Sequence, residues 1–166
     1  TKAGSLASRF AYHMTTEILP LADYCVDFHA GGASRFNAAQ IRIVPHDPVL
    51  QNLAEIFNAP FTLFSKNIAG SFRNTATRLG VKMLLFEGGK SLDINSGIAI
   101  KGVNGSKRLL ASLKMLSAKH NAASEDQPTI FIERSGWVRA KCSGLFHDYE
   151  MMGKFVKKGV VLGRIT

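Results

Sequence analysis

The stretch Tyr24-Cys25-Val26-Asp27-Phe28-His29-Ala30-Gly31-Gly32 decides the fold, because it reads as a short apolar strand that ends at a histidine and two glycines. In an α/β sheet, ligands bind in the crevice beyond the carboxyl ends of the strands, so His29 is predicted to lie in such a crevice. Gly31 and Gly32 allow the backbone to approach a bound group closely. This stretch alone leaves an alternative equally open, in which a neutral histidine ends a strand above an ordinary Gly-Gly turn.

A second stretch of the chain repeats the pattern of the first. The apolar strand predicted at 81–86 ends on Glu87-Gly88-Gly89, so an ionisable residue is again followed by two glycines. A carboxylate at the rim of an apolar strand is a candidate general base. A strand edge followed by a turn is the alternative interpretation, but two such ends together favour a functional site.

The remaining sequence predicts an α/β domain followed by a small β domain. Apolar spacing predicts helices and strands in alternation as far as residue 118, with a helix break at Gly105, and a linker-like stretch follows at 120–128. Beyond the linker, strands are predicted at 129–133 and 137–142, and a tight turn followed by a strand is predicted at 156–165. We therefore expect an α/β domain over 1–123 and a small β domain over 124–166.

Composition and charge narrow the classes of function. The chain has 166 residues, 46% of them apolar, and a net charge of +9. Its basic residues are scattered rather than clustered beside aromatic residues, and no apolar run approaches the ~20 residues that span a bilayer. These features predict neither a nucleic-acid nor a membrane partner, and the charge suits a small anionic substrate. Two distant cysteines without a CxxC pair fit a reducing cytoplasm.

Three motifs in order along the chain resemble those of the succinylglutamate desuccinylase and aspartoacylase family. Residues 22–32 are similar to its "ADxxxDLHTGG" segment, and residues 83–89 to its strand ending in "ExG". Residues 152–165 resemble the "GxxVxxGxxLGxI" turn of its C-terminal β domain. The resemblance implies a partial zinc-carboxypeptidase-like fold, with a three-layer α/β/α domain followed by a small β domain.

The resemblance also implies a zinc-dependent hydrolase that cleaves the amide bond of an N-acyl amino acid or a similar substrate. His29 would be the histidine that completes the zinc site, and Glu87 would be the catalytic general base. Asp27 is two residues from His29 on the same side of the strand, so it would orient the imidazole, although a plain polar strand residue is as good an interpretation. Arg35 and Arg78 would bind the substrate, with a solvated helix arginine the favoured alternative for Arg78.

Departures from the family pattern leave two other interpretations open. No HxxE motif, the family's source of the other two zinc ligands, precedes His29, and the "NPxxxxxxR" and "DLNRxFPG" stretches are absent. The chain starts at Thr1 without Met, so we expect a missing N-terminal part. Because Thr166 ends the chain at a predicted strand, we also expect a β domain that is cut short. The chain could instead be a non-catalytic fragment or binding module, or part of a zinc carboxypeptidase. Association with the missing segment or homo-oligomerisation is expected, and lipoyl or biotinyl attachment is not.

Overall fold

The computed structural model describes residues 1–32, 35–123 and 125–166. These residues form two units, 1–133 and 134–166, each of which is described by itself. The helical elements are α1 (Leu6–His13), a π-helical turn η1 (Met14–Ile18), η2 (Leu19–Leu21), α2 (Pro48–Phe57), α3 (Phe72–Arg78), α4 (Ser96–Ser112) and η3 (Ala118–His120). The strands are β1 (Tyr24–Gly31), β2 (Asn37–Ile43), β3 (Phe61–Phe64), β4 (Lys82–Lys90), β5 (Ile130–Ile132), β6 (Phe146–Asp148) and β7 (Gly163–Ile165).

The first unit is built on a five-stranded mixed sheet in the order β1-β4-β2-β3-β5. β1 runs parallel to β4, and β3 runs parallel to both β2 and β5, whereas β2 and β4 are antiparallel. The parallel register sets His29 directly beside Glu87. The carboxyl ends of β1 and β4, where the sequence predicted functional residues, therefore lie side by side.

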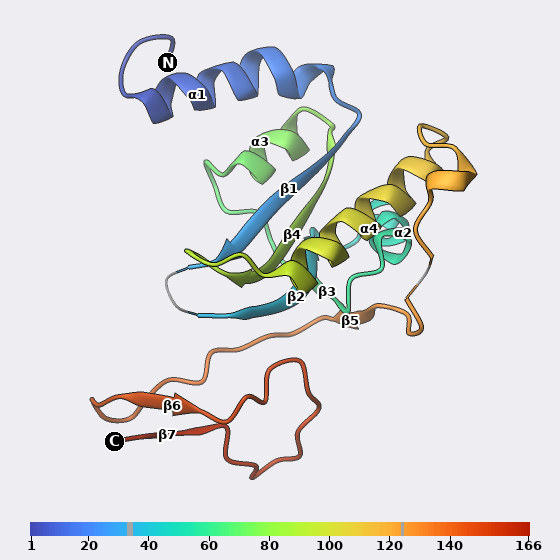
Figure 1. The fold of residues 1–166 in the computed structure, drawn as a ribbon. Coiled ribbons are helices and arrows are strands. Elements are labelled where there is room, and N and C mark those ends of the chain that lie inside the picture. The colour runs from blue at the N-terminus through green and yellow to red at the C-terminus, as the bar shows by residue number, and fades with distance from the viewer. Residues whose placement is uncertain (33–34, 124) are drawn as a thin grey trace. The chain divides into compact units, whose positions relative to one another are not determined.

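Helices cover both faces of this sheet, which confirms the predicted three-layer α/β/α architecture (Figure 1). One core lies between the sheet and the helices α2 and α4, and it centres on the fully buried side chains of Ile41, Ile43 and Phe57. A smaller core on the other face joins Leu19 and Met83 to α3. Alternation along β4 sends Leu84 and Phe86 to the first core, which leaves Glu87 on the α3 face.

Local hydrogen bonds fix the helices that pack on the sheet. The Asp47 side chain accepts from the backbone N–H groups of Val49 and Leu50 at the start of α2, and it also accepts from Lys82 Nζ of β4 at 2.7 Å. At the other end of α2, the buried Arg108 of α4 donates to the carbonyl of Phe57. One side chain at each end thus satisfies helix-terminal backbone groups and ties α2 to its neighbours.

α4 is continuous, so the helix break predicted at Gly105 is wrong. Gly105 is there because of packing, since a Cβ at this position would lie 2.5 Å from the ring atoms Cδ1 and Cζ of Phe57. Close approach of two helices, rather than backbone freedom, explains this glycine.

Replacing Gly105 by alanine is expected to destabilise the protein by about 1–2 kcal/mol. Overpacking a buried ring costs about 1–3 kcal/mol, and the better helix propensity of alanine returns up to about 1 kcal/mol. The control is Gly97→Ala in the same helix, where the nearest contact of an added Cβ is 3.7 Å. Urea unfolding should show a lower midpoint for the first variant and an equal or higher one for the second; equal behaviour would contradict this packing.

The boundary between the two units lies further along the chain than the sequence predicted. β5 pairs with β3 in the main sheet, and the buried hydroxyls of Thr62 and Thr129 are 2.8 Å apart. The first unit therefore extends to Glu133 rather than to 123. From sequence alone, a short apolar strand after a polar linker can be the first strand of a second domain or a further strand of the preceding sheet, and the two cases have the same pattern.

The second unit contains one antiparallel strand pair, β6 with β7. The strand predicted at 137–142 is wrong, because these residues form no strand. The region 156–165, predicted as a tight turn followed by a strand, ends in β7. Large side chains such as Trp137 and Phe155 are exposed in this unit. No helix within the described ranges combines the length and apolar character needed to cross a bilayer.

Candidate functional site

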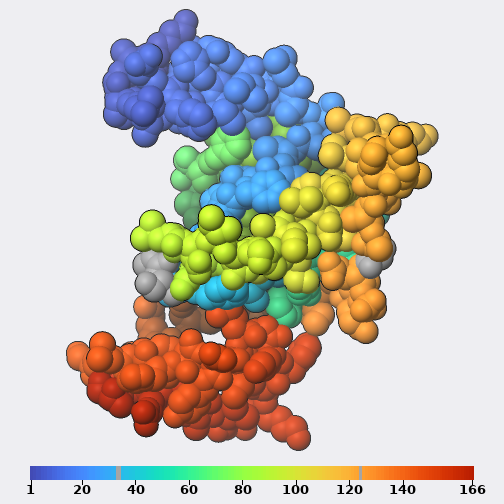
Figure 2. Space-filling view, in the orientation of Figure 1, coloured from blue at the N-terminus to red at the C-terminus, as the bar shows by residue number. Residues whose placement is uncertain are grey.

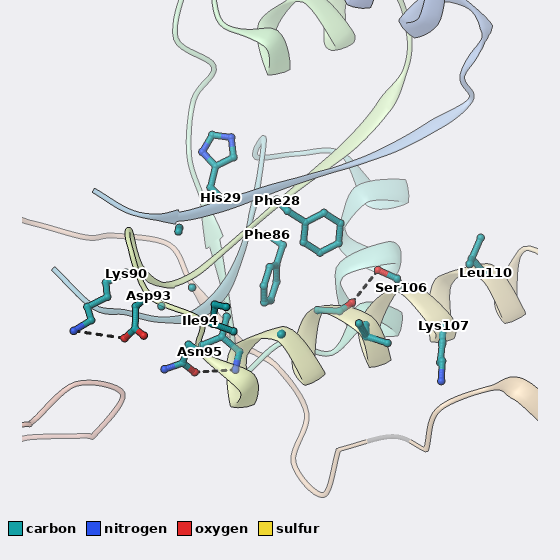
Figure 3. A pocket seen from close by; sticks show the side chains of 17 residues that line it. Phe28, His29, Phe86, Lys90, Asp93, Ile94, Asn95, Ser106, Lys107 and Leu110 are labelled. Carbon is teal, nitrogen blue, oxygen red and sulfur yellow. Dashed lines mark hydrogen bonds and ion pairs between the residues drawn. The ribbon is translucent and has the colours of Figure 1, made fainter. Parts of the chain in front are cut away.

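His29 and Asp27 form a pair on one face of β1. Residues two apart on a strand share a face, and the Nε2 atom of His29 lies 3.0 Å from Oδ2 of Asp27. Because an ionised carboxylate can only accept, this contact requires a proton on Nε2, and in the neutral imidazole Nδ1 is then the acceptor. Figure 3 shows the His29 ring on the opposite side of β1 from the rings of Phe28 and Phe86. The histidine thus faces the α3 side with one nitrogen available to a ligand.

Glu87 is held at both carboxylate oxygens by residues of β2. Asn37 Nδ2 donates to Oε1 at 2.8 Å, and Arg42 Nε lies 2.8 Å from Oε2. The Arg42 contact is a charge pair whose N–H is not aligned for a hydrogen bond. The Glu87 side chain is only 17% exposed, so little water screens this pair. The donated hydrogen bond and the charge pair together fix the orientation of the Glu87 carboxylate.

A second arginine, Arg73 of α3, is buried beside this group. It donates to Ser65 Oγ and to the Lys66 carbonyl, each at 3.0 Å. Burial lowers the pKa of the Arg73 guanidinium, and the positive charge of Arg42 lowers it further. Two arginines within electrostatic reach of each other make this side of the sheet attractive to an anion.

The two arginines that the sequence proposed for substrate binding are placed differently. Arg35 is exposed, and its Nε donates weakly to the Gly32 carbonyl at 3.5 Å. Arg78 is exposed at the end of α3, five residues after the buried Arg73. Ala33 and Ser34, which precede Arg35 in the chain, lie outside the described residues.

Gly31 brings the loop after β1 against the end of β4. A Cβ at this position would lie 2.7 Å from the Gly89 carbonyl oxygen, so no other residue fits without a backbone shift. The Gly31 carbonyl accepts from both the backbone N–H and the hydroxyl of Ser91. The glycines of the first motif therefore join the two strand ends to each other.

Sequence reasoning missed Asn37, Arg42 and Arg73. Arg42 lies between Ile41 and Ile43, whose side chains enter the core beside α2. This alternation indicates only that the Arg42 side chain points to the opposite face of the sheet. Its partner Glu87 is 45 positions away, and no local pattern connects them. Arg73 lies three residues before the buried Ala76, on the same side of α3. This spacing is the one sequence feature that could have indicated that Arg73 is buried.

A zinc site with three protein ligands does not fit these residues alone. His29 offers Nδ1, and its Nε2–Asp27 contact has the form that usually orients a metal-binding imidazole. Within the described ranges, however, no three His, Cys, Asp or Glu side chains come together as a metal-binding group. One ligand of such a site is therefore present, and a complete site is not.

Comparison with known proteins shows likeness in structure rather than in sequence. No family model matches the chain, and no curated protein matches it significantly. The structure of a succinylglutamate desuccinylase/aspartoacylase from Rhodobacter sphaeroides superposes with a TM-score of 0.85 at 24% identity, covering 100% of this chain and 52% of that one.

Two further solved structures give the same result. The product-bound ectoine utilization protein EutE from Ruegeria pomeroyi has a TM-score of 0.84 at 20% identity, and a succinylglutamate desuccinylase from Silicibacter sp. has 0.82 at 21%. They cover 99% and 100% of this chain and 52% of their own chains. The chain spans about half the length of the solved structures it resembles. It has the fold of the succinylglutamate desuccinylase and aspartoacylase proteins over that half.

Proposed function

We propose that this chain forms part of a hydrolase that cleaves the amide bond of an N-acyl amino acid or a similar small anionic substrate. The observation that carries the proposal is the pairing of His29 and Glu87 at adjacent strand ends, with Asp27 beside the histidine. The likeness to desuccinylase and aspartoacylase structures supports it. The active form would be the chain together with the half of the fold that those structures have in addition, which we call the assembled enzyme.

Glu87 would act as the general base. In amide hydrolysis, its carboxylate accepts a proton from the attacking water while the water oxygen bonds to the carbonyl carbon. The same group then returns the proton to the nitrogen as the C–N bond breaks, so that a carboxylic acid and an amine leave. Asn37 and Arg42 would hold the carboxylate in a fixed orientation for this task.

His29 would contribute one zinc ligand through Nδ1, and Asp27 would orient its ring. A bound zinc ion would polarise the substrate carbonyl and acidify water. The other ligands would have to come from the half of the fold outside these residues. The HxxE motif of the resemblance is the expected source.

Arg73 and Arg42 would make the site attractive to a substrate carboxylate, and Arg35 at the loop would be a further candidate for this role. A planar guanidinium can bind a carboxylate through two N–H groups, which suits a substrate of the N-acyl amino acid class. Arg78 stays a prediction from the resemblance, and its exposure favours Arg73 as the substrate-binding arginine of α3.

Replacing Arg73 by methionine is expected to raise KM for an N-acyl amino acid about tenfold or more, because a charge-assisted hydrogen bond to the substrate is lost. Arg78→Met on the same helix is the matched control and should leave KM within about twofold. Steady-state kinetics of both variants in the assembled enzyme would measure this. The reverse ranking would assign the role to Arg78 instead.

The reaction class is tested by a panel of substrates. The assembled enzyme is given N-acetyl and N-succinyl amino acids on one side and dipeptides and C-terminally blocked peptides on the other. We expect turnover of the N-acyl amino acids. Turnover confined to peptides would favour the carboxypeptidase alternative, and binding without turnover would favour a non-catalytic module.

A further inference from the structure

Three polar side chains form a row across the main sheet, perpendicular to its strands. His29 of β1 pairs with Glu87 of β4, and Glu87 pairs with Gln40 of β2. Ala39 and Ile41, the two neighbours of Gln40, belong to the core beside α2. Alternation therefore turns the Gln40 side chain to the opposite face, where the other two side chains of the row lie. Because neighbouring strands are about 4.8 Å apart, Glu87 has His29 one strand away on one side and Gln40 one strand away on the other.

The helix on this face leaves the row open. α3 packs on Val81 and Met83, at the start of β4, whereas Glu87 lies near the end of that strand. Figure 2 shows α3 in green and α4 in yellow on opposite sides of β1 in blue, so α4 does not cover this face either. The His29 side chain is 48% exposed, and Gln40 is half-buried. Both ends of the row are therefore accessible to a small molecule.

The side-chain amide of Gln40 is free to bind a ligand. It makes no hydrogen bond within residues 1–32, 35–123 and 125–166, and its polar atoms are not among those buried without a partner. Both carboxylate oxygens of Glu87, by contrast, are held by Asn37 and Arg42. A side-chain amide has two N–H donors and an oxygen that accepts. Beside a candidate general base, such a group is suited to bind a polar part of the substrate.

We propose that Gln40 is a specificity-determining residue, which binds the side chain of the amino acid that the reaction releases. This inference rests on the proposed function, in which the substrate carbonyl lies on the His29 side and Glu87 returns a proton to the amide nitrogen. The order of the row then gives the direction of the substrate. The acyl group lies towards β1, the amide nitrogen lies at Glu87, and the amino acid extends over β2 towards Gln40.

The dimensions and charges of the sheet surface agree with this direction. In an extended side chain, the δ atom lies roughly 5 Å from the amide nitrogen of the same residue, which is about one strand spacing. Arg42 is two residues from Gln40 on the same strand and the same face, so the substrate carboxylate would also lie over β2. An apolar side chain would leave the Gln40 amide without a partner, so we expect a preference for a substrate side chain that ends in a hydrogen-bonding group.

Two substrates of matched length test this preference. N-acetylglutamine and N-acetylmethionine have side chains of similar size, but only the first can bond to an amide. In the assembled enzyme, we expect kcat/KM to be at least about tenfold higher for N-acetylglutamine. Gln40→Met should bring the ratio of the two values close to one. Gln51→Met on α2, on the other side of the sheet, is the control and should leave the ratio unchanged.

The ratio separates specificity from loss of fold, because a partly unfolded preparation lowers both rates by the same factor. Product inhibition gives a second measurement that needs no variant, since L-glutamine should inhibit the wild-type enzyme about tenfold more strongly than L-methionine. A wild-type ratio near one, or a ratio that Gln40→Met leaves unchanged, would overturn the role of Gln40 and leave the proposed reaction intact. Failure to turn over any N-acyl amino acid would overturn the proposed function, and this inference with it.

Discussion

Replacing Glu87 by glutamine is expected to lower kcat/KM of the assembled enzyme by about 10²- to 10⁴-fold, the range that general-base catalysis contributes. Glutamine has nearly the same shape, and its carbonyl oxygen can still accept from Asn37 Nδ2. It cannot take a proton from water at neutral pH. The loss should therefore fall on kcat, while substrate binding changes little.

The Glu87→Gln experiment needs a control for the loss of negative charge. Glu55→Gln removes a carboxylate from the exposed side of α2 and should leave kcat/KM within about twofold. Urea unfolding of both variants would detect a loss of fold from the unpaired Arg42. Unchanged turnover in a folded Glu87→Gln enzyme would show that the carboxylate is dispensable, and the proposed reaction would lose its base.

Replacing His29 by alanine is expected to remove zinc binding from the assembled enzyme. Catalytic zinc is held by about three protein ligands, so the loss of one imidazole leaves too few. Asp27→Asn should have a smaller effect, about 10- to 100-fold in zinc affinity, because it changes only the group that orients the ring. Competition with a chelator measures both affinities.

A larger loss of zinc affinity in His29→Ala than in Asp27→Asn would distinguish the ligand from the group that orients it. His13→Ala is the control, because His13 is exposed on α1 and paired only with Glu17. It should leave zinc affinity unchanged. Equal zinc affinity in wild type and His29→Ala would instead make His29 a strand-end histidine, the alternative that its sequence first left open.

The apolar strands were the part of the fold most readable from sequence. β1 and β4 contain apolar residues followed by Gly pairs, and both form nearly where expected. The continuity of α4 could not be predicted, because a glycine within a helical pattern can either break the helix or allow another element to pack closely, and the neighbouring residues are the same in both cases. Only the position of Phe57 on another helix separates the two.

For the candidate site, sequence identified the groups on strand ends but not the groups that hold them. His29 and Asp27 are two residues apart, so their contact follows from strand geometry alone. The contacts of Glu87 with Asn37 and Arg42 depend on the antiparallel pairing of β2 with β4, which joins residues far apart in the chain. The burial of Arg73 likewise depends on how α3 packs. Long-range strand order is the information that local patterns lack.

The central claim is that these residues carry one part of a zinc hydrolase site, which the other half of the fold completes. Elemental analysis tests it most directly, on the 166-residue chain alone and on the assembled enzyme. We expect well below one zinc per chain for the 166-residue chain alone and about one for the assembled enzyme, as a mononuclear catalytic site requires. One zinc held by the chain alone, or none by the assembled enzyme, would contradict it.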